Sequence, residues 1–209
     1  MNSNQDLISS MILNGTLKSP HIIRAFESVD RKGFVPEEFG NYIYIDKPLP
    51  IGKDQTISQP STVAFMLELL GPKRGDRILD IGSGSAWTTA LLCYIAGKEG
   101  SVTGVERHEE LIKVGKRNLV KLNMGDHCHI ERAGRELGIQ GEQFDKILVS
   151  ASAKEVPQEL FSQLKIRGVM VIPIQNSIYR FEKVSDKEVK AEEYPGFVFV
   201  PLIKEDSKA

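Results

Sequence analysis

The stretch that decides the fold is Arg77-Ile-Leu-Asp80-Ile-Gly82-Ser-Gly84-Ser-Ala86-Trp87, with the apolar run that follows it to Ala96. The pattern predicts a buried strand, a turn on two glycines and a helix. Glycines let the backbone approach a ligand closely, and a helix N-terminus presents free N–H groups. Ser101-Val-Thr-Gly-Val-Glu106 predicts the next strand. Its terminal acid lies roughly twenty residues beyond the turn, where a ribose-binding acid is expected. Together these features predict a site for a nucleotide-like ligand.

A strand–helix rhythm continues beyond this turn. Strands are predicted over Val102–Glu106, His127–Glu131, Phe144–Ser150 and Gly168–Pro173, and helices over Glu109–Leu122 and Val156–Leu164. Such alternation predicts an α/β fold, in which a parallel sheet is covered by helices on both faces. The last third differs, because Ser177–Val184 alternates apolar and polar residues and Phe197–Leu202 is apolar. We expect these segments to be antiparallel strands at one sheet edge, and the charged tail Lys204–Ala209 to fray.

The residues before the glycine turn predict an N-terminal helical cap. The expected elements, in order, are helices over Asn4–Leu17 and Pro20–Val29, an irregular turn with a short helix over Arg31–Phe39, an extended segment over Tyr42–Leu49, a polar loop over Ile51–Gln59 and a helix from Pro60. Ser58 lies in the polar loop. On spacing alone, the loop is best interpreted as a connector with Ser58 near a helix N-cap.

Bulk composition narrows the function classes. The chain has 209 residues and a formal net charge of −1, so no strong field recruits nucleic acid or anionic lipid. No apolar run reaches about 18 residues, and the N-terminus lacks a charged region followed by an apolar core. We therefore expect a soluble protein without a secretion signal that binds neither nucleic acid nor membrane. We also expect it to be cytoplasmic and monomeric, although these bulk properties do not determine the oligomeric state.

The cysteines and histidines suggest no metal site. Cys93 and Cys128 lie far apart in an apolar helix and a strand, so we favour buried free thiols in a reducing compartment over a disulfide. His127 and His129 would share one face of a strand. Two ligands alone do not make a zinc site, and we interpret both histidines as packed or solvated.

Several motifs, taken together and in order, carry a resemblance to a known family. They are Phe34-Val-Pro-Glu-Glu38, Pro48-Leu-Pro-Ile-Gly52, Gln55-Thr-Ile-Ser-Gln-Pro60, Ile78-Leu-Asp-Ile-Gly-Ser-Gly-Ser85, Phe144-Asp145, Glu155-Val-Pro-Gln158, Val171-Ile-Pro-Ile174 and Phe199-Val-Pro-Leu202. The glycine turn is shared with many methyltransferases that use S-adenosyl-L-methionine (SAM), whereas the Gln-Thr-Ile-Ser segment is far more specific. Over nearly its whole length, the sequence resembles the protein-L-isoaspartate (D-aspartate) O-methyltransferase family.

The resemblance implies a Rossmann-like SAM-dependent methyltransferase fold with a seven-stranded, mostly parallel sheet. It implies one domain over residues 1–209, with a helical cap and active-site loop in 1–59, a SAM-binding core in 60–174 and C-terminal antiparallel strands in 175–209. By family analogy, the cofactor-binding residues are Asp80, Gly82, Ser83, Gly84, Glu106, Arg107, Ala133 and Gly134, with Glu106 on the ribose hydroxyls. Ser58 matches the family's active-site serine, which reverses the interpretation of its loop as a connector. The implied substrate-binding residues are Thr56, Ile57, Val200, Pro201 and Leu202.

The implied reaction moves a methyl group from SAM to the carboxylate of L-isoaspartyl or D-aspartyl residues in damaged proteins, leaving S-adenosyl-L-homocysteine (SAH). A peptide carboxylate has a pKa of about 4, so it is ionised at neutral pH without a general base. The protein's task is to hold its oxygen about 3–3.5 Å from the methyl carbon. We interpret Ser58 as a hydrogen-bonding positioner of that carboxylate. The neighbouring backbone nitrogen attacks the carbonyl carbon of the methyl ester and displaces methanol. The resulting succinimide hydrolyses partly to aspartate, which repairs the protein.

Three short stretches depart from the family pattern. Ala86 and Trp87 replace the usual third glycine and tyrosine, and Ser150-Ala-Ser-Ala153 replaces Gly-Ala-Ala-Ala. Arg132-Ala133-Gly134 replaces Gly-Asp-Gly, whose acid binds the adenine amino group. Loss of that bond would cost about 0.5–1.5 kcal/mol unless Glu131 or a backbone carbonyl substitutes. Two alternatives stay open: a methyltransferase of the same fold with another carboxylate acceptor, and a non-catalytic module that docks on damaged proteins.

Overall fold

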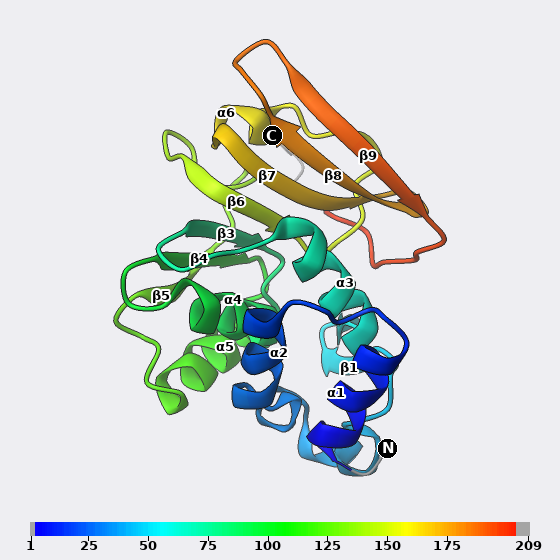
Figure 1. Ribbon diagram of the computed structural model, residues 1–209. Coiled ribbons are helices and arrows are strands. Elements are labelled where there is room, and N and C mark those ends of the chain that lie inside the picture. Colours follow the sequence, from blue (N-terminus) through cyan, green and yellow to red (C-terminus); the bar gives the residue numbers. More distant parts are fainter. Residues whose placement is uncertain (1–2, 204–209) are drawn as a thin grey trace.

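The computed structural model describes residues 3–203 and is built around one seven-stranded sheet (Figure 1). Its strands are β3 (Arg77–Ile81), β4 (Ser101–Glu106), β5 (Cys128–Arg132), β6 (Phe144–Val149), β7 (Leu164–Ile174), β8 (Ser177–Lys183) and β9 (Val189–Pro195). They lie in the order β5-β4-β3-β6-β7-β8-β9. The five strands from β5 to β7 are parallel, whereas β8 and β9 are antiparallel additions at one edge. The predicted α/β fold with a mostly parallel sheet is confirmed.

Alternation along the strands divides the buried side chains into two cores. On β3, Ile78 packs into the core on one face and Leu79 into the core on the other. The first face is covered by α3 (Pro60–Leu70), α4 (Trp87–Ala96) and α5 (Glu109–Lys121), and the second carries the short helix α6 (Glu159–Ser162). Helices therefore lie on both faces, as predicted, but the second face relies mainly on connecting segments.

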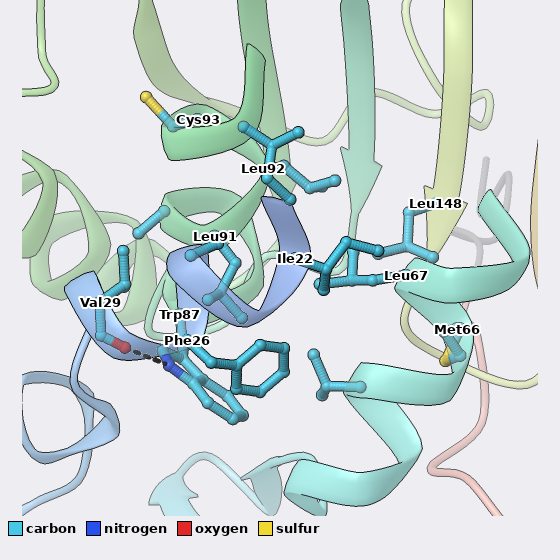
Figure 2. Close-up of a cluster of buried hydrophobic side chains, with 14 of the residues drawn as sticks. Ile22, Phe26, Val29, Met66, Leu67, Trp87, Leu91, Leu92, Cys93 and Leu148 are labelled. Carbon is cyan, nitrogen blue, oxygen red and sulfur yellow. Dashed lines mark hydrogen bonds between the residues drawn. The ribbon is translucent and has the colours of Figure 1, made fainter. Parts of the chain in front are cut away.

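The N-terminal residues form a helical layer (Figure 1). The layer consists of α1 (Asn4–Leu13), α2 (Pro20–Ser28) and the 3-10 helices η1 (Arg31–Phe34) and η2 (Glu37–Tyr42). In this layer α2 packs against α4, and α1 packs against α2. Phe26 meets the Trp87 ring edge to face at 5.6 Å, and Trp87 Nε1 donates a 3.2 Å hydrogen bond to the Val29 carbonyl (Figure 2). Glu68 of α3 accepts bonds from the Lys18 and Ser19 amides at the start of α2. The cap is thus joined to both the glycine-turn helix and α3.

A β-hairpin occupies the segment that was predicted to be a polar loop. Strand β1 (Leu49–Gly52) pairs antiparallel with β2 (Gln55–Ile57). The turn residues Lys53 and Asp54 have φ angles of 55° and 56°. Both angles fall in the left-handed region that hairpin turns require, but neither residue is the glycine that usually signals it. The extended segment expected over Tyr42–Leu49 is also wrong, because η2 continues to Tyr42 and turns follow it.

The C-terminal third differs from the prediction in two places. The edge strand is β9, a polar and mostly exposed segment, and the apolar run Phe197–Leu202 is not a strand of the sheet. That run instead crosses back toward β6, where Ser152 donates to the Val200 carbonyl and accepts from the Leu202 amide, each at 2.8 Å. Helix α6 is shorter than expected because β7 already begins at Leu164. The predicted fraying of Lys204–Ala209 lies outside the described residues.

Cys93 and Cys128 form a disulfide, so the expectation of free thiols is wrong. Helix α4 packs against β5, the edge strand, and brings the two Cα atoms within 6.1 Å. This distance is within the range that a disulfide spans. The two cysteines are 35 residues apart in sequence, and nothing in their local patterns signals that the fold joins them.

We expect the Cys93–Cys128 disulfide to stabilise the protein by about 3–4 kcal/mol, since it closes a loop of 35 residues in the unfolded chain. The double variant Cys93→Ala/Cys128→Ala should unfold at a lower guanidinium concentration than the parent under non-reducing conditions. Reductant should shift the parent toward the variant and leave the variant unchanged. A parent that titrates two free thiols after denaturation without reductant would contradict the assignment.

Candidate active site

The glycine turn lies where the chain reverses its direction across the sheet. From β3 the chain moves to β4 and β5 on one side, and it later returns to place β6 on the other side of β3. In open α/β sheets such a switch point opens a crevice at the carboxyl ends of the strands. Gly82 and Gly84 have φ angles of 85° and 54°, which favour glycine. Ala86 adopts a φ of 73° at the N-cap of α4.

The carboxylate of Glu106 joins the ends of β3 and β4. Glu106 Oε2 accepts the Gly84 amide at 3.0 Å, and Oε1 accepts the Arg107 and His108 amides at 2.8 and 2.9 Å. Three of about four acceptor positions on this carboxylate are therefore occupied. At 6% exposure, the side chain is held rigidly with little freedom to turn away. One further donor, such as a ligand hydroxyl, can still bind to it.

Asp80 lies beneath the turn and does not line the crevice. Its side chain is fully buried, its Oδ2 accepts a 2.6 Å bond from Thr89 Oγ1, and its Oδ1 has no partner within residues 3–203. Burial raises the pKa of Asp80 to about 6; the nearby Glu106 adds to the rise and the Thr89 bond opposes it. The fold therefore keeps an under-coordinated acid directly below the glycine turn.

The first of two adjoining hollows lies between the hairpin and the glycine turn. Its lining includes the predicted residues Thr56, Ile57, Ser58, Gly82, Ser83, Gly84, Glu106 and Val200. The Ser58 side chain is half-buried and forms no hydrogen bond within residues 3–203. The hydroxyls of Ser83 and Ser85 are buried there without partners in the same range. This hollow thus presents several hydroxyl groups beside the backbone of the turn.

The second hollow extends over the ends of β4 and β5. Its lining includes Arg107, Ala133, Gly134, Pro201 and Leu202, and it shares Gly82 and Glu106 with the first hollow. Arg107 Nη1 is buried there with no hydrogen-bond partner within residues 3–203. The two hollows together bring every predicted site residue except Asp80 to one continuous crevice.

Glu131 does not replace the acid missing at Ala133. Glu131 is exposed on β5, where it lies 3.2 Å from His129 Nε2, and it does not line the second hollow. Glu136 does line that hollow. Among the acids that line it, Glu136 is the nearest in sequence to Ala133. It lies four residues beyond the end of β5, in a stretch with no regular pattern, and sequence reasoning missed it.

Other lining residues also escaped the sequence analysis. Gln55 and Ala151 lie at the junction and line both hollows, and Trp87 lines the first. Gln55 belongs to the Gln-Thr-Ile-Ser motif, so its position in that motif was an available signal. Trp87 was noted only as a departure from the family pattern.

The histidine pair considered as metal ligands does not converge. His129 Nε2 lies near Glu131 and Thr103, whereas His127 Nε2 lies 3.4 Å from Cys93 Sγ. Within residues 3–203, the one cluster of three potential ligands is Cys93, His127 and Cys128, and its two sulfurs are bonded to each other.

The crevice fits SAM on three observations. The turn places a backbone free of side chains next to unpartnered buried hydroxyls, Glu106 retains an acceptor position for a ribose hydroxyl, and an under-coordinated acid lies below where a cationic amino-acid group would bind. The second hollow is lined by Arg107 and by apolar residues such as Leu137. No helix within residues 3–203 has the length and apolar character needed to cross a membrane.

Proteins of similar sequence match this chain over most of its length. A protein-L-isoaspartate O-methyltransferase of Ignicoccus hospitalis is 37% identical over 207 residues, covering 97% of this chain and 98% of its own. One of Petrotoga mobilis is 42% identical over 190 residues, covering 88% and 87%. The family model for protein-L-isoaspartate(D-aspartate) O-methyltransferase matches residues 2–207.

Solved structures agree with these sequence matches. A crystal structure from Plasmodium falciparum, assigned as a protein-L-isoaspartate O-methyltransferase in complex with SAH, superposes with a TM-score of 0.87 at 26% identity, covering 98% of this chain and all of the other. A second protein-L-isoaspartate O-methyltransferase structure superposes with a TM-score of 0.84 at 26% identity, covering 96% of this chain and 66% of its own. With the Ser58 hairpin and the glycine turn facing one crevice, the chain belongs to the protein-L-isoaspartate (D-aspartate) O-methyltransferase family.

Proposed function

We propose that this protein transfers the methyl group of SAM to the carboxylate of L-isoaspartyl and D-aspartyl residues in damaged proteins, with Ser58 as the residue that positions this carboxylate. The observation that carries the proposal is the shared lining of one hollow by the Ser58 hydroxyl and the glycine turn. The cofactor and the substrate would therefore meet in one enclosed space. We also propose that residues 1–209 act as a single domain and that the protein is a monomer.

SAM supplies an activated methyl group when it is bound, so the protein's residues have to orient rather than activate the acceptor. An ionised peptide carboxylate needs no general base. The Glu106 carboxylate already accepts three backbone bonds, so we assign it to holding the ribose. Ser58 Oγ is free to donate one hydrogen bond to a substrate oxygen, which would fix the direction of attack.

The substrate peptide would enter between the hairpin and the segment 200–202. Thr56, Ile57 and Val200 all line the first hollow. Pro201 and Leu202 continue this wall along the second hollow. The backbone bonds between Ser152 and the residues Val200 and Leu202 hold the wall against the end of β6. A flexible isoaspartyl chain can thread such a slot, whereas folded secondary structure would not.

Paired peptides that differ only in an aspartyl or isoaspartyl linkage test this function. With labelled SAM, we expect base-labile label in the isoaspartyl peptide and little in the aspartyl one. Label in the aspartyl peptide alone would indicate another acceptor. Binding of SAH without transfer to either peptide would indicate a non-catalytic module.

Replacing Ser58 with alanine tests the positioning role. We expect Ser58→Ala to lower kcat on an isoaspartyl peptide about 10- to 100-fold, because a hydrogen bond to a charged group contributes about 1.5–3 kcal/mol. SAH affinity, measured by calorimetry, should stay within about twofold of the parent. Ser28→Ala, on the exposed end of α2, is the matched control and should change neither quantity. Unchanged turnover in Ser58→Ala would remove the assigned role.

Position 133 tests how the adenine is recognised. We expect Ala133→Asp to bind SAH up to about tenfold more tightly than the parent, because the new carboxylate can accept a bond from the adenine amino group. Ala133→Leu adds similar bulk without an acceptor and should not tighten binding. Calorimetric titration measures both variants. Equal or weaker binding by Ala133→Asp would show that adenine lies elsewhere or that its amino group is already bound.

The raised pKa of Asp80 predicts a pH dependence. Above a pH of about 6 the buried acid is ionised and favours the cationic amino group of SAH, whereas below it the charge is lost. We therefore expect SAH affinity to fall several-fold from pH 7.5 to pH 5, and this fall to be absent in Asp80→Asn. Stability should move the other way: ionised Asp80 carries a burial cost above pH 6, so Asp80→Asn should gain more stability at pH 8 than at pH 5. An SAH affinity that does not change with pH in the parent would contradict the attraction between ionised Asp80 and the amino group of SAH.

A further inference from the structure

Arg31 is a fully buried arginine that lies outside the crevice. It is part of η1, its exposure is 0%, and within residues 3–203 it forms no ion pair with a carboxylate. An unpaired buried charge is costly and is normally avoided. Burial lowers the pKa of Arg31 to about 10, with Asp46 opposing the shift, so the guanidinium stays charged at neutral pH. A group that costs so much to bury needs a reason beyond packing.

The guanidinium donates to five backbone carbonyls in two segments. Nη1 donates to Ile43 at 2.8 Å and Ile45 at 3.2 Å, and Nη2 donates to Lys47 at 3.0 Å, Ile57 at 3.5 Å and Ser58 at 3.0 Å. The first three carbonyls belong to the irregular segment before the hairpin, and the last two belong to the candidate active-site residue and its neighbour. One planar group thus fixes the backbone of Ser58 against a segment more than ten residues away.

Asp46 holds the other side of the same backbone. Its Oδ1 accepts the Ser61 amide at 2.8 Å and its Oδ2 accepts the Gln59 side chain at 3.1 Å. Two charged side chains therefore hold the segment from Ser58 to the start of α3. Arg31 bonds to the Ser58 carbonyl, and Asp46 accepts hydrogen bonds from the residues that follow. The coulombic attraction between these two side chains reinforces both.

Arg31 also contacts Trp87, a residue that lines the crevice. Its guanidinium carbon lies 5.4 Å from the centre of the Trp87 ring, within the range of a cation–π interaction. Trp87 begins α4 directly after the glycine turn and lines the first hollow. Trp87 Nε1 is fixed by the Val29 carbonyl, two residues before Arg31 (Figure 2). One guanidinium therefore contacts both the Ser58 backbone and the first residue of the glycine-turn helix.

We propose that Arg31 is a positioning residue for methyl transfer, which sets the distance between the Ser58 hydroxyl and the methyl donor from beneath the hairpin. This inference rests on the proposed function. Lysine cannot reproduce the contact, because a single ammonium has three donors at one point and cannot span carbonyls in two segments with a planar fork. The charge alone is thus insufficient, and the planar geometry of arginine is required.

The test compares Arg31→Lys and Arg31→Gln with the control Arg24→Lys, an exposed arginine on α2. We expect both Arg31 variants to lower kcat on an isoaspartyl peptide at least tenfold, with SAH affinity within threefold of the parent and the control unchanged. Hydrogen exchange should rise in residues 43–47 and 57–61 but not in α5. Trp87 is the chain's one tryptophan, so a change in fluorescence reports a change in the surroundings of its ring.

The outcomes separate the two proposals. Parent-like kcat in Arg31→Lys would overturn the positioning role, and so would equal losses of kcat and SAH affinity, which indicate general loosening. If the parent itself methylates no isoaspartyl peptide, the proposed function fails, while hydrogen exchange still decides whether Arg31 holds the hairpin. Should Arg31→Gln fail to fold, Arg31→Lys carries the test, because it retains the charge and most of the side-chain volume.

Discussion

The hydrogen bonds accepted by the Glu106 carboxylate are the constraint on which the crevice depends. The bond from the Gly84 amide ties the end of β4 to the glycine turn after β3, and the bonds from the Arg107 and His108 amides hold the same carboxylate to the backbone that follows β4. The turn itself has left-handed backbone angles and leads directly into the N-terminus of α4. A nucleoside placed here meets a preformed acceptor and a bare backbone. This is the arrangement that open α/β sheets provide at their switch points.

Two charged side chains, Asp80 and Arg31, are buried next to the crevice, where burial of charge lowers the stability of the fold. Asp80 is kept beneath the turn with one oxygen unpartnered within the described residues, and Arg31 is kept beneath the hairpin, where it donates to backbone carbonyls, lies over the Trp87 ring and is attracted by Asp46. Removing either side chain would take hydrogen bonds away from buried partners, namely the Thr89 hydroxyl at Asp80 and five backbone carbonyls at Arg31. One charge lies below the cofactor side and the other below the substrate side. Their placement links the energetics of the core to the chemistry proposed above it.

The central elements could be predicted from sequence because their signals are local. The β3–turn–α4 unit, β4 and α5 lie within a residue or two of their expected bounds, since glycines, periodic apolar residues and a terminal acid mark them. The hairpin, β9 and the disulfide were missed or wrong because non-local pairing decides them. Lys53 and Asp54 carry no turn signal, and β9 is a polar edge strand. The site residues came from the motifs, whereas the backbone contacts of Arg31 leave no sequence pattern at all.

The most direct test of the account is a crystal structure of the protein with SAH and an isoaspartyl peptide. The account predicts the ribose hydroxyls on Glu106, the sulfur in the first hollow, and the isoaspartyl carboxylate between that sulfur and Ser58 Oγ. SAH bound away from the glycine turn, or a peptide carboxylate that does not approach Ser58, would contradict it.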